Sequence, residues 1–133
     1  MNLSKDLVAA SSTPLVLGIV AEGETYGYEI VKRVEMLSGG QLSWTEGMMY
    51  PLLHRLEQQG LLEARWRIAE TGRKRKYYGL TELGLKSLAQ QQQQWQMINN
   101  ALARVWDNLN NAAKTGSLGA HSSGGNGNEF QPA

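Results

Sequence analysis

Residues 61–80 are the part of this chain with strand character, and helical patterns lie on both sides of them. Residues 61–67 alternate toward a strand, residues 75–80 resemble the returning strand, and Thr71-Gly72 between them is a turn signal. The connecting loop is longer than a two-residue turn, so the tip of this hairpin should project into solvent. A single hairpin among helices predicts a mainly α fold with a small β-hairpin.

Two helical segments open the chain. In the first, before residue 25, Pro14 is compatible with two interpretations: the first position of a helix, or a kink in a longer helix that starts near Lys5. Thr25 is a suitable N-cap for a second helix over residues 26–38, in which apolar residues recur at helical spacing.

A third helix is predicted over residues 46–59, with Thr45 as its candidate cap. Pro51 is tolerated only in a first turn, which argues for a start closer to Met48. Spacing i, i+3, i+4, i+7 predicts the core face as Met49, Leu52, Leu53 and Leu56. The opposite face then carries Gly47, Tyr50, Pro51, His54, Arg55 and Gln58.

Thr81 is a candidate cap for a last helix over residues 82–110. Its apolar seam follows a heptad pattern with Leu88, Trp95, Ile98, Leu102, Val105 and Leu109. An exposed seam needs a partner, either the first helix of the same chain or a second copy, and we expect both on different faces. The predicted organisation is a winged domain over residues 1–81, a dimerisation helix over 82–112 and a disordered tail over 113–133.

Composition excludes several classes of protein. The 133 residues suffice for one compact domain, and the absence of cysteine excludes disulfide scaffolds, zinc fingers and thiol nucleophiles. No apolar run is long enough for a transmembrane helix and no signal peptide opens the chain, so a cytoplasmic location without membrane contact is expected. No catalytic constellation or metal-ligand spacing is visible, so we predict neither an enzyme nor a cofactor.

Positive charge is concentrated in the hairpin, although the formal net charge is only +1. Six of the thirteen Lys and Arg residues lie between positions 65 and 76, where Glu70 is the one nearby opposing charge. Three helices followed by a basic hairpin is the element order of a winged helix, in which the third helix enters the major groove of DNA and the hairpin contacts the backbone. Double-stranded DNA is therefore the predicted partner.

Three segments resemble the PadR-type bacterial transcriptional regulators, and the resemblance covers about residues 12–110. They are GETYGYEI at residues 23–30, YPLLHRLEQQGLL at 50–62 and GRKRKYYGLT at 72–81. Family members usually have threonine at the position of Met48, which puts a DNA contact by Met48 in doubt. The single C-terminal helix is similar to the short branch of the family, which includes repressors of multidrug transporter genes.

The resemblance implies a homodimeric repressor that binds an inverted repeat. The expected DNA-binding residues are Tyr26, Tyr50, Pro51, His54, Arg55, Arg73, Lys74, Arg75 and Lys76. In short family members a tryptophan of each subunit stacks on a planar aromatic compound at the dimer interface. The ligand-binding residues implied here are Trp95, Ile98 and Leu17, although Trp95 is equally compatible with interface core. Two of the other three tryptophans, Trp44 and Trp66, are expected to pack.

Two other functions are compatible with the same patterns. One is a winged helix that binds an acidic protein through its basic hairpin. The other is a small-molecule binding protein whose main site is the seam around Trp95, without specific DNA recognition.

Overall fold

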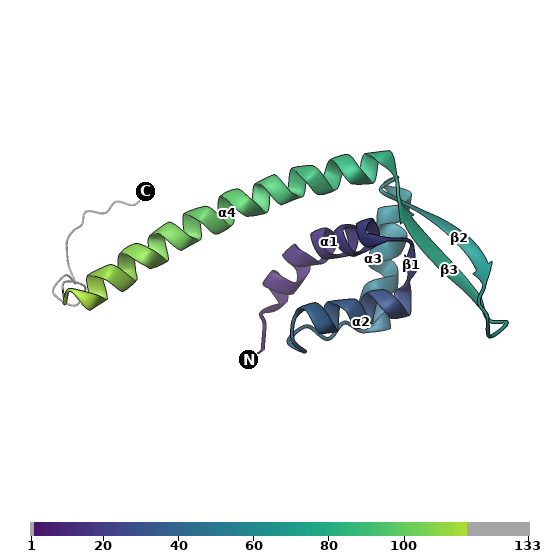
Figure 1. Cartoon of the computed structure of the whole chain (residues 1–133), viewed down its shortest axis with the longest axis horizontal. Helices are drawn as coiled ribbons and strands as arrows, with labels where there is room; N and C mark the ends of the chain where they lie inside the picture. The colour runs from purple at the N-terminus through teal and green to yellow at the C-terminus, as the bar shows by residue number, and fades with distance from the viewer. Residues whose placement is uncertain (1, 117–133) are drawn as a thin grey trace. The chain divides into compact units, whose positions relative to one another are not determined.

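The structure is a computed structural model that describes residues 2–116 (Figure 1). Its elements in chain order are α1 (Lys5–Glu22), β1 (Thr25–Tyr26), α2 (Gly27–Leu37), α3 (Glu46–Gln58), β2 (Leu62–Ile68), β3 (Lys74–Leu80) and α4 (Glu82–Lys114). The predicted mainly helical fold with a small β element is confirmed, and a third strand is added to the hairpin.

The chain divides into two compact units, Met1–Gln92 and Gln93–Ala133. The first unit holds α1, α2, α3, the sheet and the first turns of α4. Over the described residues, the second unit consists of the remainder of α4 and the two residues that follow it.

Helix α1 is a long helix with a proline inside it, which settles the two interpretations of Pro14 in favour of a start at Lys5. Ser4 caps the helix, because its hydroxyl accepts a hydrogen bond of 3.2 Å from the Leu7 N–H. Pro14 removes one backbone hydrogen bond. The segment after it offsets this loss by burying Val16, Leu17, Ile19 and Val20.

The expected N-cap at Thr25 is wrong. Thr25 belongs to strand β1, and its hydroxyl donates to Glu29 Oε1 at 2.7 Å instead of accepting from a helix N–H. Helix α2 begins at Gly27, and no side chain caps it. The reason is tertiary: β1 pairs antiparallel with β3, with Thr25 opposite Tyr78, and this partner lies far along the chain.

Helix α3 begins at Glu46, earlier than Pro51 suggests. Thr45 is its cap, as expected, because its hydroxyl accepts a hydrogen bond of 3.2 Å from the Met48 N–H. Pro51 withholds one donor from the carbonyl of Gly47, but Gly47 is exposed, so water can reach that carbonyl. The predicted core face is confirmed by the buried side chains Met49, Leu52, Leu53 and Leu56.

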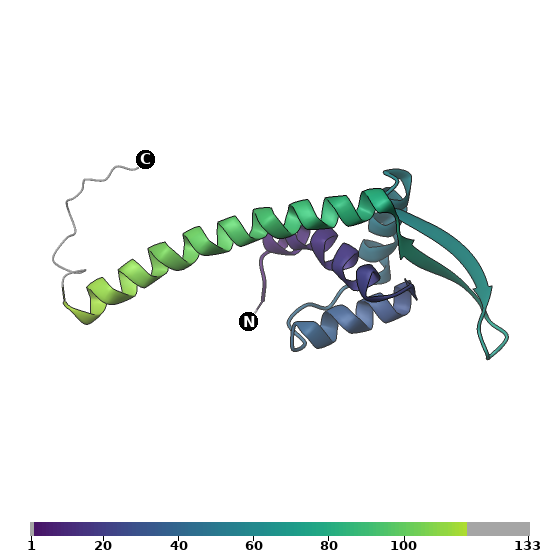
Figure 2. The ribbon, with the colours of Figure 1, turned by 45° about the horizontal axis from the view of Figure 1, so that its top comes forward.

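The three-stranded sheet has the order β1-β3-β2. Strands β2 and β3, with the turn at residues 69–73, form a hairpin that extends beyond α1, α2 and α3 and is called the wing below (Figure 2). Gly72 has φ 85° in its turn, where the Gly72 N–H donates to the Ala69 carbonyl at 2.8 Å. Tyr78 is buried, whereas Tyr77 faces the other way and meets the Tyr26 ring edge-on at 5.2 Å between centroids.

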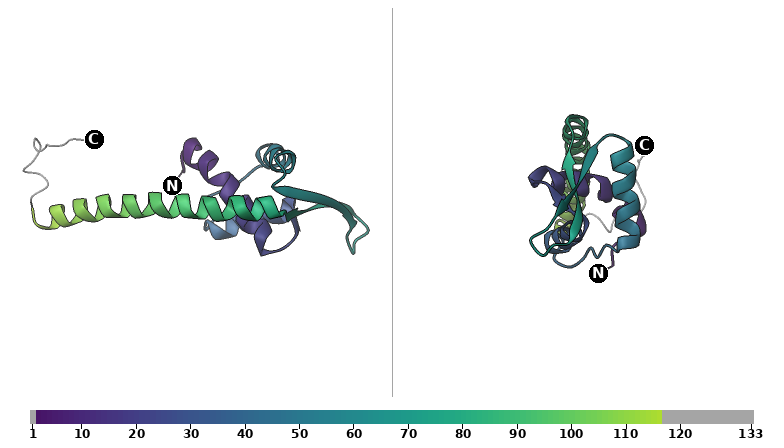
Figure 3. Two further views of the ribbon diagram at one scale, coloured as in Figure 1. Left: turned by 90° about the horizontal axis from the view of Figure 1, so that it is seen from above. Right: turned by 90° about the vertical axis from the view of Figure 1, so that its right-hand side faces the viewer.

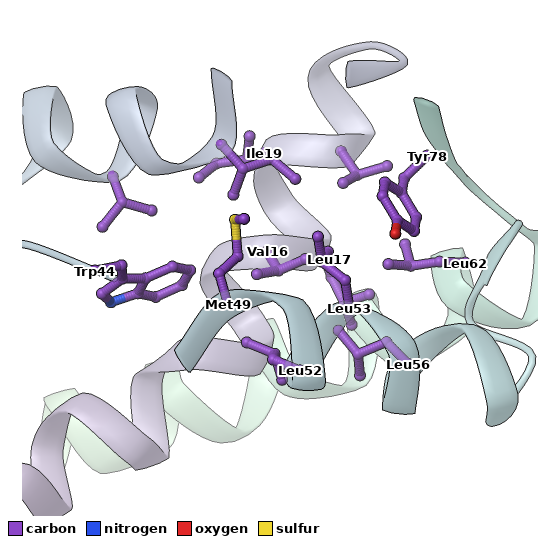
Figure 4. Close-up of a cluster of buried hydrophobic side chains, with 13 residues drawn as sticks. Val16, Leu17, Ile19, Trp44, Met49, Leu52, Leu53, Leu56, Leu62 and Tyr78 are labelled. Atoms are coloured by element: carbon purple, nitrogen blue, oxygen red, sulfur yellow. The ribbon is translucent and has the colours of Figure 1, made fainter. Parts of the chain in front are cut away.

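The hydrophobic core lies between the helices and the sheet, with Trp44 at one end and Tyr78 at the other (Figure 4). The expectation that Trp44 packs is confirmed, but the same expectation for Trp66 is wrong, because Trp66 is 62% exposed. Alternate residues of β2 share a face, and that face passes from buried at Leu62 to exposed at Trp66 where the wing leaves the helices.

Thr81 caps α4 as predicted. Its hydroxyl accepts from the Gly84 N–H at 2.9 Å and donates to the Gly60 carbonyl at 2.6 Å, which ties the helix start to the end of α3. Helix α4 ends at Lys114, beyond the predicted end. The rest of the predicted disordered tail, from residue 117, lies outside the described residues.

Gly84→Ala is expected to lower the free energy of unfolding by about 2–3 kcal/mol, measured by urea denaturation. An added Cβ would overlap the Leu61 carbonyl oxygen and would lie 2.8 Å from Leu80 Cδ1, and the Leu61 backbone cannot move cheaply. Gly18→Ala in α1 is the matched control, because nothing lies within 4 Å of its Cβ position. Helix propensity predicts that this control gains up to about 1 kcal/mol. A similar gain for Gly84→Ala would contradict the packing described here.

Candidate nucleic-acid interface

The exposed face of α3 carries the residues that the sequence assigned to it. Tyr50 is 48% exposed, and Pro51, His54 and Arg55 are exposed as well. The buried residues of the same helix hold this orientation, because they alternate with the exposed ones at the helical period. Four side chains of different chemistry are therefore presented outward from one rigid element.

The wing lies beside this helix (Figure 3), and its sequence carries a cluster of cations. Arg73 and Lys74 are exposed at the turn, where the Ala69 N–H donates to the Arg73 carbonyl at 2.8 Å. Further back, the guanidinium of Arg75 lies 4.4 Å from the ring centroid of Tyr26. This cation–π contact orients Arg75 without neutralising its charge.

A cleft of about 660 Å³ lies between the start of α2, α3 and the wing. It gathers most of the predicted DNA-binding residues, namely Tyr26, Tyr50, His54, Arg73, Lys74, Arg75 and Lys76. Pro51 and Arg55 do not line it. Glu46 is the carboxylate among its lining residues, so positive charge dominates the walls.

Lys76 differs from the other wing cations because its ammonium is already engaged. Its Nζ lies 3.2 Å from Glu57 Oε1 on α3, and the side chain is 32% exposed. The hydrogen bond to Glu57 raises the pKa of Lys76 above its ordinary value. This ion pair fixes the wing to α3, which leaves Lys76 less available for a phosphate than the sequence suggested.

The sequence missed the carboxylates that face the wing, and Glu70 is not the one opposing charge. Glu24 forms ion pairs with Arg67 and, at 3.8 Å, with Arg65. Glu63 lies 3.9 Å from Arg65. Glu24 precedes β1, so the unforeseen third strand brings it to the sheet. No local pattern could have indicated this contact.

The three residues expected at a ligand site lie in different environments. Leu17 is fully buried in the core of the first unit and offers no surface to a ligand in the single chain, so its expected role stays a prediction. Its position on the inner face of α1 explains this. In the second unit Trp95 is partly exposed and Ile98 is 51% exposed, so both side chains remain accessible.

The free energy of unfolding is expected to fall as pH rises above about 10. Burial raises the pKa of Tyr78, and the hydrogen bond to Glu57 raises that of Lys76. Both groups hold their protons more tightly in the folded chain, so their contribution is complete below the unfolded pKa values and is lost as pH passes the folded ones.

Urea denaturation across this alkaline range measures the effect. Glu57→Gln removes the main partner of Lys76, so the fall should become shallower. Glu63→Gln is the control, because Glu63 does not contact Lys76 or Tyr78, and it should leave the slope unchanged. An equal slope in the wild type and in Glu57→Gln would contradict the coupling.

In the part of the chain that the structure describes, no helix has the length and apolar character needed to cross a membrane. Within the same residues, no group of three or more His, Cys, Asp or Glu side chains is placed to hold a metal ion.

A three-helix core with a cationic wing beside an exposed third helix defines a winged-helix DNA-binding domain. The sequence model described as "Transcriptional regulator PadR-like family" matches residues 16–90. The chain belongs to this family of transcriptional regulators, as the resemblance implied.

Individual relatives agree with this assignment. The chain is 33% identical over 88 residues to the transcriptional regulator YqjI of Escherichia coli (strain K12), a match that covers 66% of this chain and 41% of that longer protein. A PadR-like transcriptional regulator from Bacillus cereus is similar in structure, with TM-score 0.69, 28% identity and coverage of 77% and 97% of the two chains. A PadR family regulator from Clostridium difficile R20291 has TM-score 0.64, 30% identity and coverage of 72% and 98%.

Proposed function

We propose that this regulator acts as a homodimeric repressor that binds an inverted-repeat operator. The cleft between α3 and the wing carries the proposal, because it places cations on one wall and the polar groups of α3 on the other. Tyr50, His54 and Arg55 contact base edges in the major groove, and Arg73, Lys74 and Arg75 contact the phosphates beside it. Bound in this way near a promoter, the dimer blocks transcription.

The exposed seam of α4 supports the dimer. In the second unit the seam residues Ile98, Leu102, Val105 and Leu109 are between 39% and 55% exposed in the single chain. Their heptad spacing is typical of helices that pair with one another. A second copy presents the same seam, so one two-fold contact covers both.

Trp95 supports the further proposal that a planar aromatic compound releases the repressor from DNA. Its side chain is partly exposed and lies in the same seam, so two copies would approach the two-fold axis. Quenching of tryptophan fluorescence by planar aromatic compounds tests this proposal. Trp95→Ala should abolish the saturable part of the signal, whereas Trp106→Ala, at another exposed tryptophan of α4, should keep it.

Selection of bound sites from random duplex DNA tests the main proposal. The expected product is an inverted repeat with half-site centres about 34 Å apart, one helical turn. Recovery of no common sequence would contradict specific recognition. Binding to an acidic protein with no duplex retained would instead favour an interaction module.

Arg55→Ala is expected to relax the preference at particular base pairs of the selected site, by about 1–3 kcal/mol of discrimination. Arg55 is exposed on α3 outside the cleft, so its loss should not disturb the wing. Comparative binding to the selected duplex and to single-base variants measures this effect. A uniform loss across all duplexes would show that Arg55 contacts the backbone.

A further inference from the structure

The wing carries two large apolar side chains that remain exposed. Trp66 is 62% exposed and Ile68 is 74% exposed, both on strand β2. Alternate residues of a strand share one face, so both belong to the face of Leu62, which is buried. The face that forms core near the helices therefore continues outward as an apolar strip along the wing.

The strand register shows which way this strip faces. Trp66 lies opposite Lys76, and Ile68 lies opposite Lys74. Directly opposed residues of an antiparallel pair project from the same face. Because Lys76 reaches Glu57 on α3, this face turns toward α3.

Trp66 also lines the cleft together with residues of α3. The cations Arg73 and Lys74 line the same cleft, so its walls combine an exposed indole with positive charge. The apolar strip therefore lies on the side of the wing where the DNA backbone is proposed to run.

The positive charge of the cleft and the apolar strip of the wing together indicate what kind of partner binds there. The cations beside the strip favour a polyanion, and phosphate contacts alone would not require apolar side chains. A DNA duplex offers apolar surface next to its phosphates in the deoxyribose walls of the minor groove. Proteins that enter this groove frequently insert apolar side chains there.

We infer that Trp66 and Ile68 form an apolar contact between the wing and the minor groove of DNA, beside the major groove that α3 enters. This inference rests on the proposed DNA-binding function. The minor groove of a G·C pair contains the 2-amino group of guanine, and an A·T pair lacks it. Since this group obstructs the groove floor, the contact favours stretches without it, and the wing contributes to specificity.

Two duplexes that differ only at the minor groove test the inference. Alternating dI-dC and alternating dG-dC present the same major-groove groups, because inosine is guanine without its 2-amino group. The full chain is expected to bind the dI-dC duplex about fivefold more tightly in an anisotropy titration. Trp66→Ala should bind both duplexes equally, with an unchanged salt slope, because no cation is removed. Ile68→Ala should lose part of the preference.

Met36→Ala is the matched control, because Met36 is 71% exposed on α2 and does not line the cleft. It should keep the full preference. As an independent readout, tryptophan fluorescence should change on binding dI-dC in the wild type and in Trp106→Phe, but much less in Trp66→Phe.

Two results distinguish a failure of the minor-groove contact from a failure of the proposed DNA-binding function. If the wild type binds duplex DNA but shows no preference, or if Trp66→Ala keeps the preference, the minor-groove contact is wrong and the proposed function stands. If heparin displaces every duplex from the wild type as readily as it displaces single-stranded DNA, the proposed function and this inference both fail.

Discussion

Replacing Arg73 and Lys74 together with alanine is expected to remove about half of the salt dependence of DNA binding and much of the affinity. Both side chains are exposed at the wing tip, and neither forms an ion pair within the described residues. About four phosphate contacts per protomer, from Arg73, Lys74, Arg75 and in part Lys76, hence about eight per dimer, predict a slope of about −7 for log affinity against log salt. The double variant removes about four of these contacts, so its slope should be about −3 to −4.

Binding to the selected operator at a series of salt concentrations measures this slope. Lys32→Ala with Lys86→Ala is the matched control, because both lysines are exposed, neither lines the cleft, and the net charge falls equally. Its slope should stay close to that of the wild type. Equal slopes for the two double variants would show that bulk charge, rather than the wing, determines the affinity.

Comparing Lys76→Ala with Lys74→Ala tests whether an ion-paired lysine of the wing contributes to the salt slope. Because Lys76 is paired with Glu57, its loss should change the salt slope less than the loss of Lys74, although both residues lie on β3. A slope that falls equally in both variants would show that DNA displaces Glu57 from Lys76.

The double variant Leu102→Glu with Leu109→Glu is expected to dissociate the dimer and to lower the affinity for the full operator by about 10²- to 10⁴-fold. Both leucines lie in the seam, where a second copy would bring like charges together. Each protomer would then bind one half-site, without the gain that linkage to its partner provides. Sedimentation gives the oligomeric state, and titration of full and half operators gives the affinities.

The double variant Asn100→Glu with Ala103→Glu is the control on the same helix. Both residues are exposed and fall outside the heptad seam, so this variant should remain dimeric with unchanged affinity. Circular dichroism checks that both proteins keep their helix. Dimers that persist with Leu102 and Leu109 replaced would contradict pairing through this seam.

The sequence was most informative where local forces decide the structure. The apolar period of Met49, Leu52, Leu53 and Leu56 determined which face of α3 is buried. The hydroxyls of Thr45 and Thr81 cap their helices as predicted, because a cap depends on a few neighbouring residues. Alternation and the turn at Gly72 located the wing in the same way.

Local rules failed where a distant partner competes for the same groups. Thr25 resembles an N-cap, but pairing with β3 draws it into a strand. Pro51 resembles a helix start, but the Thr45 cap and the buried leucines maintain the helix through it. Trp66 resembles a core residue, and its exposure follows from where the helices stop covering the sheet.

The nucleic-acid interface also combines features that local sequence predicts with features that only tertiary contacts decide. Its residues and their sequence order could be predicted, because the exposed face of a helix and a cluster of cations are visible in the chain itself. The pairing of Lys76 with Glu57 and of Arg67 with Glu24 could not, because ion pairs depend on distance in space between residues far apart in sequence. The sequence alone determined which face of α3 and which cluster of cations are presented to solvent. The tertiary structure decided which of those cations remain free for a phosphate, since that depends on the carboxylates that folding brings within reach.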